Sequence, residues 1–308
     1  MKIAQNALEL VGNTPLVKLD RIMHMHDCKA EVVAKLEKCN PAGSSKDRVA
    51  ISMIEDAENR GLLKPGALII EPTSGNTGVG LAMAAACKGY QLILTMPASM
   101  SVERRLLLAA MGARIVLTEA ELGMSGAVQK AEQLLAENPG AFMPSQFDNP
   151  ANPAAHRSTA EEILRDTEGE VDVFVACAGT GGTVSGTGRF LKAANPDVRI
   201  IAVEPAESPL ISEGRSGAHG IQGIGANFIP ENYDASVVDE VMTVATEEAY
   251  QYGRELAANE GLLCGISSGA AVAAAARLAR LPEYAGKRIV ALLPDTGERY
   301  LSTPMFKE

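Results

Sequence analysis

Residues Val171–Thr183 read VDVFVACAGTGGT, in which an apolar run leads directly into a glycine-rich loop. An unbroken apolar run is typical of a strand buried on both faces of a parallel sheet. The residues that follow, Val184–Ala193, have a helical pattern. A strand, a glycine-rich turn and a helix in this order form one βα unit, so the segment predicts an α/β fold.

The same alternation extends along the chain in both directions. Further apolar runs predict strands over Glu31–Leu36, Ala67–Ile70, Gln91–Met96, Arg114–Leu117, Ile200–Val203 and Arg288–Leu292. Helical patterns follow most of them, over Asp47–Arg60, Gly78–Lys88, Val102–Met111, Ser125–Glu137 and Thr246–Asn259. We therefore expect mostly parallel sheets with helices on both faces. The loop-rich stretch Pro144–Pro153 is the expected domain boundary or hinge.

Composition argues against several classes of protein. The 308 residues carry a net charge of −10 and no long basic run, which disfavours a nucleic-acid partner. The five cysteines form no CxxC pair, so we expect free thiols in a reducing, cytoplasmic compartment. We find no signal peptide, no apolar run long enough for a membrane span, and no zinc-site spacing among the histidines His24, His26, His156 and His219. We therefore expect no metal.

The glycine-rich loop Gly179–Thr183 is suited to binding an anion. Its glycines let backbone N–H groups approach an anion closely, Thr180 and Thr183 add hydroxyl donors, and the next helix supplies its positive N-terminus. The loop is neither a strict GxGxxG nor a Walker A motif, which favours a single phosphate monoester over a dinucleotide or NTP. A tight strand-to-helix turn would explain the same glycines, and the loop alone does not separate these alternatives.

A lysine follows a second loop, Asn40–Arg48, with the sequence NPAGSSKDR. The pattern places Lys46 in the first turn of a helix, where the helix dipole disfavours an ammonium group. Such a site helps to supply the neutral amine that a Schiff base requires. Taken alone, an ordinary exposed lysine is the commoner explanation.

Two more polar loops precede helices. The loop Glu71–Gly78, EPTSGNTG, carries the side chains Thr73, Ser74, Asn76 and Thr77, which could clamp a carboxylate. Helix capping requires one such residue, so four invite a further explanation. The loop Gly265–Gly269, GISSG, offers Ser267 and Ser268, for which capping alone is the favoured explanation.

Taken together, these segments resemble a known family. The motifs NPAGSSKDR, PTSGNTG, QFDNPANP, GTGGT, IQGIGANFIP, GISSG and GERYLST look like those of cysteine synthase of the A type (O-acetylserine sulfhydrylase). The resemblance runs from Gly12 to Thr303. It implies a fold-type-II pyridoxal 5′-phosphate (PLP) enzyme, similar to the tryptophan synthase β subunit, with two three-layer αβα domains. Residues 40–149 would form a smaller, mobile domain, and residues 1–39 and 150–308 a larger one that anchors PLP.

The resemblance also implies a role for each candidate residue. Lys46 would hold PLP as a Schiff base and act as the catalytic acid and base. The other cofactor-binding residues would be Asn76 at the 3′ oxygen, Ser268 at the pyridine nitrogen, and Gly179, Thr180, Gly181, Gly182 and Thr183 at the phosphate. The substrate would be bound by Thr73, Ser74, Thr77, Gln146 and Gly225.

The reaction implied is a ping-pong β-replacement. O-acetyl-L-serine would lose acetate to leave an aminoacrylate, and sulfide would add to give L-cysteine. The small domain would close to shield this intermediate from water. The family also suggests a homodimer and binding of the C-terminal tail of serine acetyltransferase.

Two residues depart from the family pattern, and two other functions stay open. Ser45 stands where most relatives have an apolar residue, and Asn227 replaces the last glycine of GIGAGF. The alternatives are a related PLP β-replacement enzyme, using O-phosphoserine or resembling cystathionine β-synthase, and a regulatory partner of serine acetyltransferase. An O-phosphoserine enzyme should place an extra arginine by the pocket, for which Arg215 is the only obvious candidate in the relevant loop.

Overall fold

The computed structural model describes residues 3–73 and 75–307, which form two compact units. The small unit comprises Met1–Val11 and Asn40–Asn152, and the large unit comprises Gly12–Cys39 and Pro153–Glu308. From the sequence we expected residues 1–39 to belong wholly to the larger domain. They are divided because the short helix η1 (Ala7–Leu10) contacts α3 of the small unit, and such a short helix leaves no periodic pattern in the sequence.

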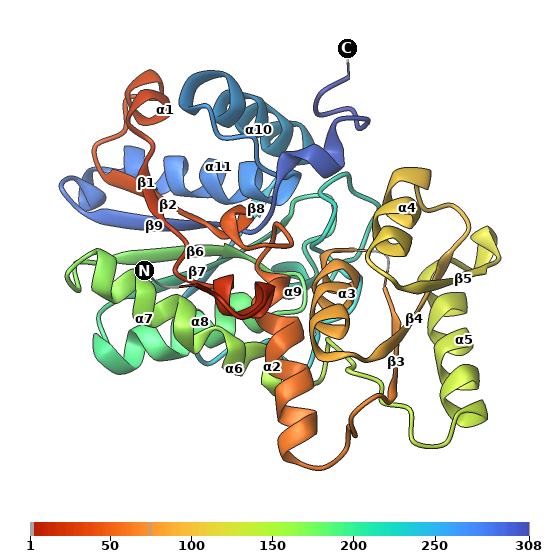
Figure 1. Cartoon of the computed structure of the whole chain (residues 1–308). Helices are drawn as coiled ribbons and strands as arrows, with labels where there is room; N and C mark the ends of the chain where they lie inside the picture. Colours follow the sequence, from red (N-terminus) through yellow and green to blue (C-terminus); the bar gives the residue numbers. More distant parts are fainter. Residues whose placement is uncertain (1–2, 74, 308) are drawn as a thin grey trace. The chain divides into compact units, whose positions relative to one another are not determined.

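The small unit contains a parallel three-stranded sheet in the order β3-β4-β5 (Figure 1). The strands are β3 (Leu68–Pro72), β4 (Gln91–Pro97) and β5 (Arg114–Thr118). Their register pairs Ile70 with Ile93. All three were predicted from apolar runs, and each ends one or two residues later than expected because its last residues still pair with a neighbour.

Helices cover both faces of this sheet. On one face, Gly78 of α3 (Asn76–Lys88) lies against Leu94 of β4 and Leu108 of α4 (Val102–Ala110). On the other face, Ala131 of α5 (Gly123–Glu137) joins a buried cluster with two sheet residues, Ile70 and Ile93. Helix α2 (Lys46–Asn59) packs on α3, and η3 (Ala120–Leu122) precedes α5. The small unit is therefore a three-layer αβα arrangement.

The large unit contains a six-stranded sheet in the order β1-β2-β9-β6-β7-β8. Its strands are β1 (Leu16–Lys18), β2 (Glu31–Leu36), β6 (Val173–Cys177), β7 (Arg199–Pro205), β8 (Glu240–Val244) and β9 (Arg288–Leu293). Only β1 runs antiparallel to its neighbour. The two edge strands β1 and β8 were not predicted, because neither contains the continuous apolar run that marks a central strand.

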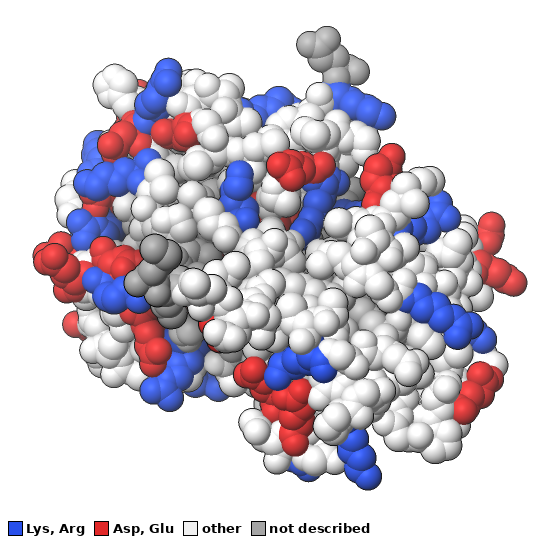
Figure 2. Space-filling view, in the orientation of Figure 1, with Lys and Arg blue, Asp and Glu red and all other residues white. Residues whose placement is uncertain are grey.

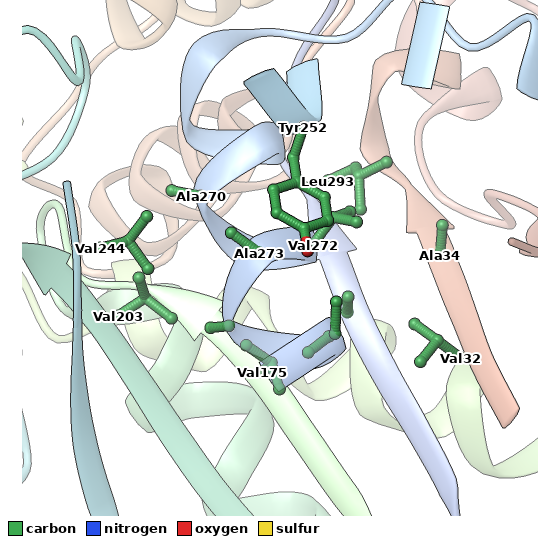
Figure 3. Close-up of a cluster of buried hydrophobic side chains, with 14 of the residues drawn as sticks. Val32, Ala34, Val175, Val203, Val244, Tyr252, Ala270, Val272, Ala273 and Leu293 are labelled. Carbon is green, nitrogen blue, oxygen red and sulfur yellow. The ribbon is translucent and has the colours of Figure 1, made fainter. Parts of the chain in front are cut away.

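The faces of the larger sheet are covered by different helices. Helices α10 (Thr246–Glu260) and α11 (Ile266–Arg280) pack on one face through an apolar cluster that includes Val175, Val203 and Ala273 (Figure 3). Helices α7 (Arg157–Asp166) and α8 (Gly182–Ala194) pack on the other face. The shorter helices are α1 (Asp20–Met25), η2 (Glu37–Cys39), α6 (Ala151–Ala155), α9 (Leu210–Glu213), η4 (Pro282–Tyr284) and η5 (Gly297–Tyr300).

Positive and negative side chains are interspersed on the face shown in Figure 2. All five cysteines are free. Within residues 3–73 and 75–307, no helix is long and apolar enough to cross a membrane. The same residues contain no group of three or more His, Cys, Asp or Glu side chains arranged to hold a metal ion.

Candidate active site

The candidate residues fall into two sets, one in each unit. The small unit carries Lys46, Thr73, Asn76, Thr77 and Gln146, and the large unit carries Gly179–Thr183, Gly225 and Ser268. Ser74, which was expected to bind substrate, lies outside the described residues. Most members of both sets lie at the carboxyl end of a parallel strand or the beginning of a helix, where α/β folds bind ligands.

Lys46 is the first residue of α2, as the sequence predicted. The preceding turn is held by Asp47, whose carboxylate accepts hydrogen bonds from Ala42 N (2.6 Å) and Ser44 Oγ (3.4 Å). The Lys46 carbonyl lies so close to Gly80 of α3 that a Cβ there would come within 2.7 Å of the oxygen. Gly80 is one helical turn after Asn76, so the beginning of α2 lies beside the beginning of α3.

Ser45, the departure next to Lys46, is 1% exposed, and its Oγ has no hydrogen-bond partner among the described residues. Its backbone is helical, with φ −59° and ψ −20°, so its hydroxyl does not cap α2. A buried hydroxyl without a partner costs roughly 1–3 kcal/mol relative to a small apolar side chain. We find no compensating contact for it within the described residues.

The loop after β3 positions three polar side chains. Thr73 is 4% exposed, and its Oγ1 accepts a hydrogen bond from Gly75 N at 3.3 Å. Asn76 is the first residue of α3. The N-cap residue is Gly75, which has no side chain that could cap the helix. Thr77 is 3% exposed and donates from Oγ1 to Oε1 of Gln146 at 2.5 Å. The loop therefore does more than cap a helix, since the Thr77 hydroxyl is fixed by a contact beyond the cap.

Gln146 is brought to Thr77 by a carboxylate that sequence reasoning missed. Glu71, the fourth residue of β3, is 1% exposed and accepts hydrogen bonds from Ser145 N (2.9 Å) and Gln146 N (3.2 Å). Burial raises the pKa of Glu71 to about 7, although these two N–H groups oppose the shift. Asn152 Nδ2 donates to the Gln146 carbonyl at 2.7 Å, so the loop is held on both sides.

The glycine-rich loop of the large unit is a backbone cradle. Gly181, the N-cap of α8, has φ 79°, and a Cβ there would lie 2.7 Å from Tyr233 Cα. A Cβ on Gly179 would lie 2.5 Å from the Gly223 carbonyl oxygen. Both positions therefore require glycine, and the loop presents the first N–H groups of a 13-residue helix. Such a terminus suits an anion.

The segment that carries Gly225 lies beside this cradle. Gly225 N donates to the Ala178 carbonyl at 3.3 Å, and its own carbonyl is 3.1 Å from His219 Nε2. Asn227, the second departure, adopts φ 62° and accepts a hydrogen bond from Ser208 Oγ at 3.1 Å. One small cavity is lined by residues that include Gly179, Gly181, Gly225 and Asn227.

Ser268 lies in the first turn of α11 and is fully buried. Its Oγ has no hydrogen-bond partner in the described part of the chain. Beside it, Cys177 Sγ lies 3.2 Å from the carbonyl oxygen of Ser267. Burial, with a smaller contribution from Asp295, raises the pKa of the Cys177 thiol to about 12, so the thiol is neutral.

These features fit the cofactor that the resemblance implies. The glycine cradle and the helix terminus behind it suit the phosphate of PLP. The orphaned Ser268 hydroxyl is a buried polar group that a ring nitrogen would satisfy. A neutral hydroxyl there would leave that nitrogen without a carboxylate partner at this residue. Lys46, at the start of α2 in the small unit, stays the lysine that the resemblance predicts for the Schiff base.

Comparison with known proteins agrees with this fit. The family described as "Pyridoxal-phosphate dependent enzyme" matches residues 7–295. Cysteine synthase A of Escherichia coli (strain K12) is 50% identical over 317 residues, which cover 100% of this chain and 97% of the relative. A cysteine synthase of Staphylococcus aureus (strain Mu50) is 48% identical over 307 residues, covering 99% and 98%.

Solved structures show the same similarity in three dimensions. A cysteine synthase from Entamoeba histolytica has a TM-score of 0.97 at 45% identity, covering 100% of this chain and 92% of that one. An O-ureido-L-serine synthase has a TM-score of 0.94 at 45% identity, covering 99% and 96%. Proteins named for different products therefore share this fold.

Proposed function

The chain belongs to the pyridoxal-phosphate-dependent enzymes and, within them, to the cysteine synthases, and we propose that it converts O-acetyl-L-serine and sulfide to L-cysteine and acetate. Full-length similarity to two cysteine synthases, at 50% and 48% identity, carries this proposal. The presence of Lys46 at the start of α2 favours catalysis over a purely regulatory role.

Bound PLP would supply an electron sink. It would accept the electron pair that is left at the substrate Cα when the Cα proton is removed. We assign that proton transfer to Lys46, which would also hold the cofactor. Acetate leaves Cβ with the electron pair of the C–O bond, and sulfide then forms the new Cβ–S bond. Lys46 returns the proton to Cα.

The other residues bind and orient. Gly179–Thr183 would bind the cofactor phosphate, Asn76 would bind its 3′ oxygen, and Ser268 would bind its ring nitrogen. Thr73, Ser74, Thr77 and Gln146 bind the substrate carboxylate, with Gly225 at the substrate. The hydrogen bond from Thr77 to Gln146 supports this assignment only in that it holds the two side chains next to each other. Closure of the small unit excludes water from the reacting atoms.

An O-phosphoserine substrate is disfavoured by Arg215. Its guanidinium is paired with Glu213 at 3.1 Å, and both side chains are more than half exposed, at 59% and 56%. A phosphate-binding arginine would be expected in a protected position without an acidic neighbour. We further propose a cytoplasmic homodimer that accepts the C-terminal tail of serine acetyltransferase, as the family resemblance suggests.

The test compares turnover of O-acetylserine with sulfide, O-phosphoserine with sulfide, and serine with homocysteine. We expect the first pair to be preferred and the purified protein to be yellow. Lys46→Ala should lack the visible band. Its activity should fall by about 10²–10⁴-fold or more, because the substitution removes the proton-transfer group. Lys64→Ala is the control, since Lys64 is an exposed lysine of the same unit. A wild-type protein that stays colourless with PLP contradicts the proposal.

A further inference from the structure

His156 is a buried histidine that none of the proposed roles uses. It is 0% exposed and precedes α7, yet its side chain makes no capping hydrogen bond to that helix. Its Nδ1 lies 3.2 Å from Thr159 Oγ1, and its Nε2 lies 3.1 Å from Thr183 Oγ1. The imidazole therefore links a buried threonine of α7 to the last residue of the phosphate-binding loop.

The packing around this contact is tight. A Cβ on Gly186 of α8 would come within 2.1 Å of the Pro153 carbonyl, so the turn before His156 lies directly against α8. Helices α7 and α8 also pack on each other. The turn that carries His156 is thus packed closely against α8, and the two threonine contacts then orient the ring.

The direction of the two hydrogen bonds matters to an anion. A neutral imidazole has one N–H donor and one acceptor nitrogen, and a hydroxyl donates once and accepts up to twice. If Nδ1 carries the proton, Nε2 accepts the Thr183 hydroxyl proton and an anion meets only Thr183 lone pairs. If Nε2 carries the proton, Thr183 Oγ1 accepts it and the Thr183 hydroxyl proton is released toward the anion.

We propose that His156 is a positioning residue that sets the polarity of the Thr183 hydroxyl for a phosphate monoester. The chain of donors runs from the Thr159 hydroxyl to Nδ1, from Nε2–H to Thr183 Oγ1, and from the Thr183 hydroxyl to the phosphate. Thr159 is itself 0% exposed, so its hydroxyl is confined with the ring. This inference rests on the proposed function, because it takes the PLP phosphate as the anion.

The main experiment measures PLP affinity by titrating apoprotein with PLP and following absorbance. His156→Phe keeps a ring but removes both nitrogens, and Thr183→Val removes the hydroxyl. Each should weaken PLP binding by about ten- to a hundredfold, the value of one hydrogen bond to a charged group. The double variant should be no more than about threefold weaker than the worse single variant, since both changes break the same chain. Thr159→Val should weaken binding by about three- to tenfold.

Thr187→Val is the matched control. Thr187 is also a fully buried threonine of α8, and its Oγ1 has no hydrogen-bond partner among the described residues. This variant should leave PLP affinity within about twofold of wild type. His156→Gln should restore part of the affinity lost in His156→Phe, because an amide N–H can replace Nε2–H.

Two spectroscopic readouts separate positioning from a general loss of packing. Nitrogen-15 NMR of wild-type holoprotein should show His156 protonated at Nε2. Phosphorus-31 NMR should show a shifted phosphate signal in Thr159→Val, which removes the hydroxyl that faces His156 Nδ1. A proton at Nδ1 in the holoprotein overturns the inference, even if His156→Phe fails to fold.

The affinities give two further outcomes. Equal PLP affinity in wild type, His156→Phe and Thr159→Val overturns the inference and leaves the proposed function standing. Failure of the wild-type protein to bind PLP overturns both together.

Discussion

At the scale of single residues, neighbours in the chain have very different surroundings. Lys46 is partly exposed at the start of α2, whereas Ser45 is buried and its hydroxyl has no partner among the described residues. Both positions stand out in the sequence, one as the predicted Schiff-base lysine and one as a departure from the family. The sequence could not predict the burial of Ser45, because burial depends on what packs against the loop.

Replacing Ser45 by alanine should therefore stabilise the protein. Ser45→Ala removes the cost of a buried, unsatisfied hydroxyl, and we expect the free energy of unfolding to rise by about 1 kcal/mol. Urea unfolding measures the change. Ser52→Ala, in the same helix, is the comparison, because Ser52 Oγ donates to the Ala151 carbonyl at 2.7 Å. The unfolding free energy of Ser52→Ala should fall by about 1 kcal/mol. A fall of similar size in Ser45→Ala would contradict the view that the Ser45 hydroxyl destabilises the protein.

At the scale of elements, the ends of strands hold loops in place. Glu71 near the end of β3 holds the loop of Gln146 through two backbone N–H groups. A strand-end glutamate in an apolar run is a signal that could have been noticed in the sequence. Its partners are more than seventy residues away in the chain, however, so no local pattern could identify them.

Glu71 predicts a pH dependence of stability. Its pKa is about 7 when folded and 4.5 ordinarily, so between these values the folded state keeps a proton that the unfolded state releases. Stability should therefore fall as pH rises through this window, by up to about 1.4 kcal/mol per pH unit, and then level off above pH 7.

Urea unfolding from pH 5 to pH 8 tests this dependence. Glu71→Gln should remove the part of the pH dependence that comes from this carboxyl group. The difference in unfolding free energy between wild type and variant should therefore change with pH. The exposed Glu137→Gln should leave the wild-type slope unchanged. A difference between wild type and Glu71→Gln that is the same at every pH would count against a raised pKa.

The turn before α8 makes a second prediction at this scale. Gly181→Ala introduces a Cβ at φ 79° and within 2.7 Å of Tyr233 Cα, so we expect it to cost about 2–4 kcal/mol and to weaken phosphate binding. Gly286→Ala is the control, because Gly286 has φ 75° but open space around it, and should cost about 1 kcal/mol. Urea unfolding of the two variants distinguishes crowding from backbone strain. Equal losses of unfolding free energy in Gly181→Ala and Gly286→Ala would exclude a role for crowding.

At the scale of the whole molecule, the two units are αβα arrangements with unequal protection of their strands. β5 of the small unit is an edge strand without a buried residue, whereas β9 lies inside the larger sheet with five buried residues. Local opening is easiest where few apolar contacts are lost. The amides of Arg114–Thr118 should exchange at least about tenfold faster than those of Arg288–Leu293. Hydrogen exchange read by mass spectrometry tests this, and equal protection contradicts it.

The amino-acid sequence by itself determined the α/β class, the central strands, the helices that follow them, and the family. Apolar runs and glycine-rich turns are local consequences of burial and backbone sterics, so they are visible without a structure. The order of seven motifs then identified the family that the comparisons support. The roles proposed for individual site residues come from that resemblance and stay predictions.

Only the tertiary structure decided which distant residues support those motifs. The edge strands β1 and β8, the grouping of Met1–Val11 with the small unit, and the buried side chains Glu71 and His156 escaped sequence analysis. His156 carries no motif of its own, and its meaning comes from the 3.1 Å contact with Thr183 across two packed helices. Such contacts join residues far apart in the chain, and their geometry follows from packing rather than from any local pattern.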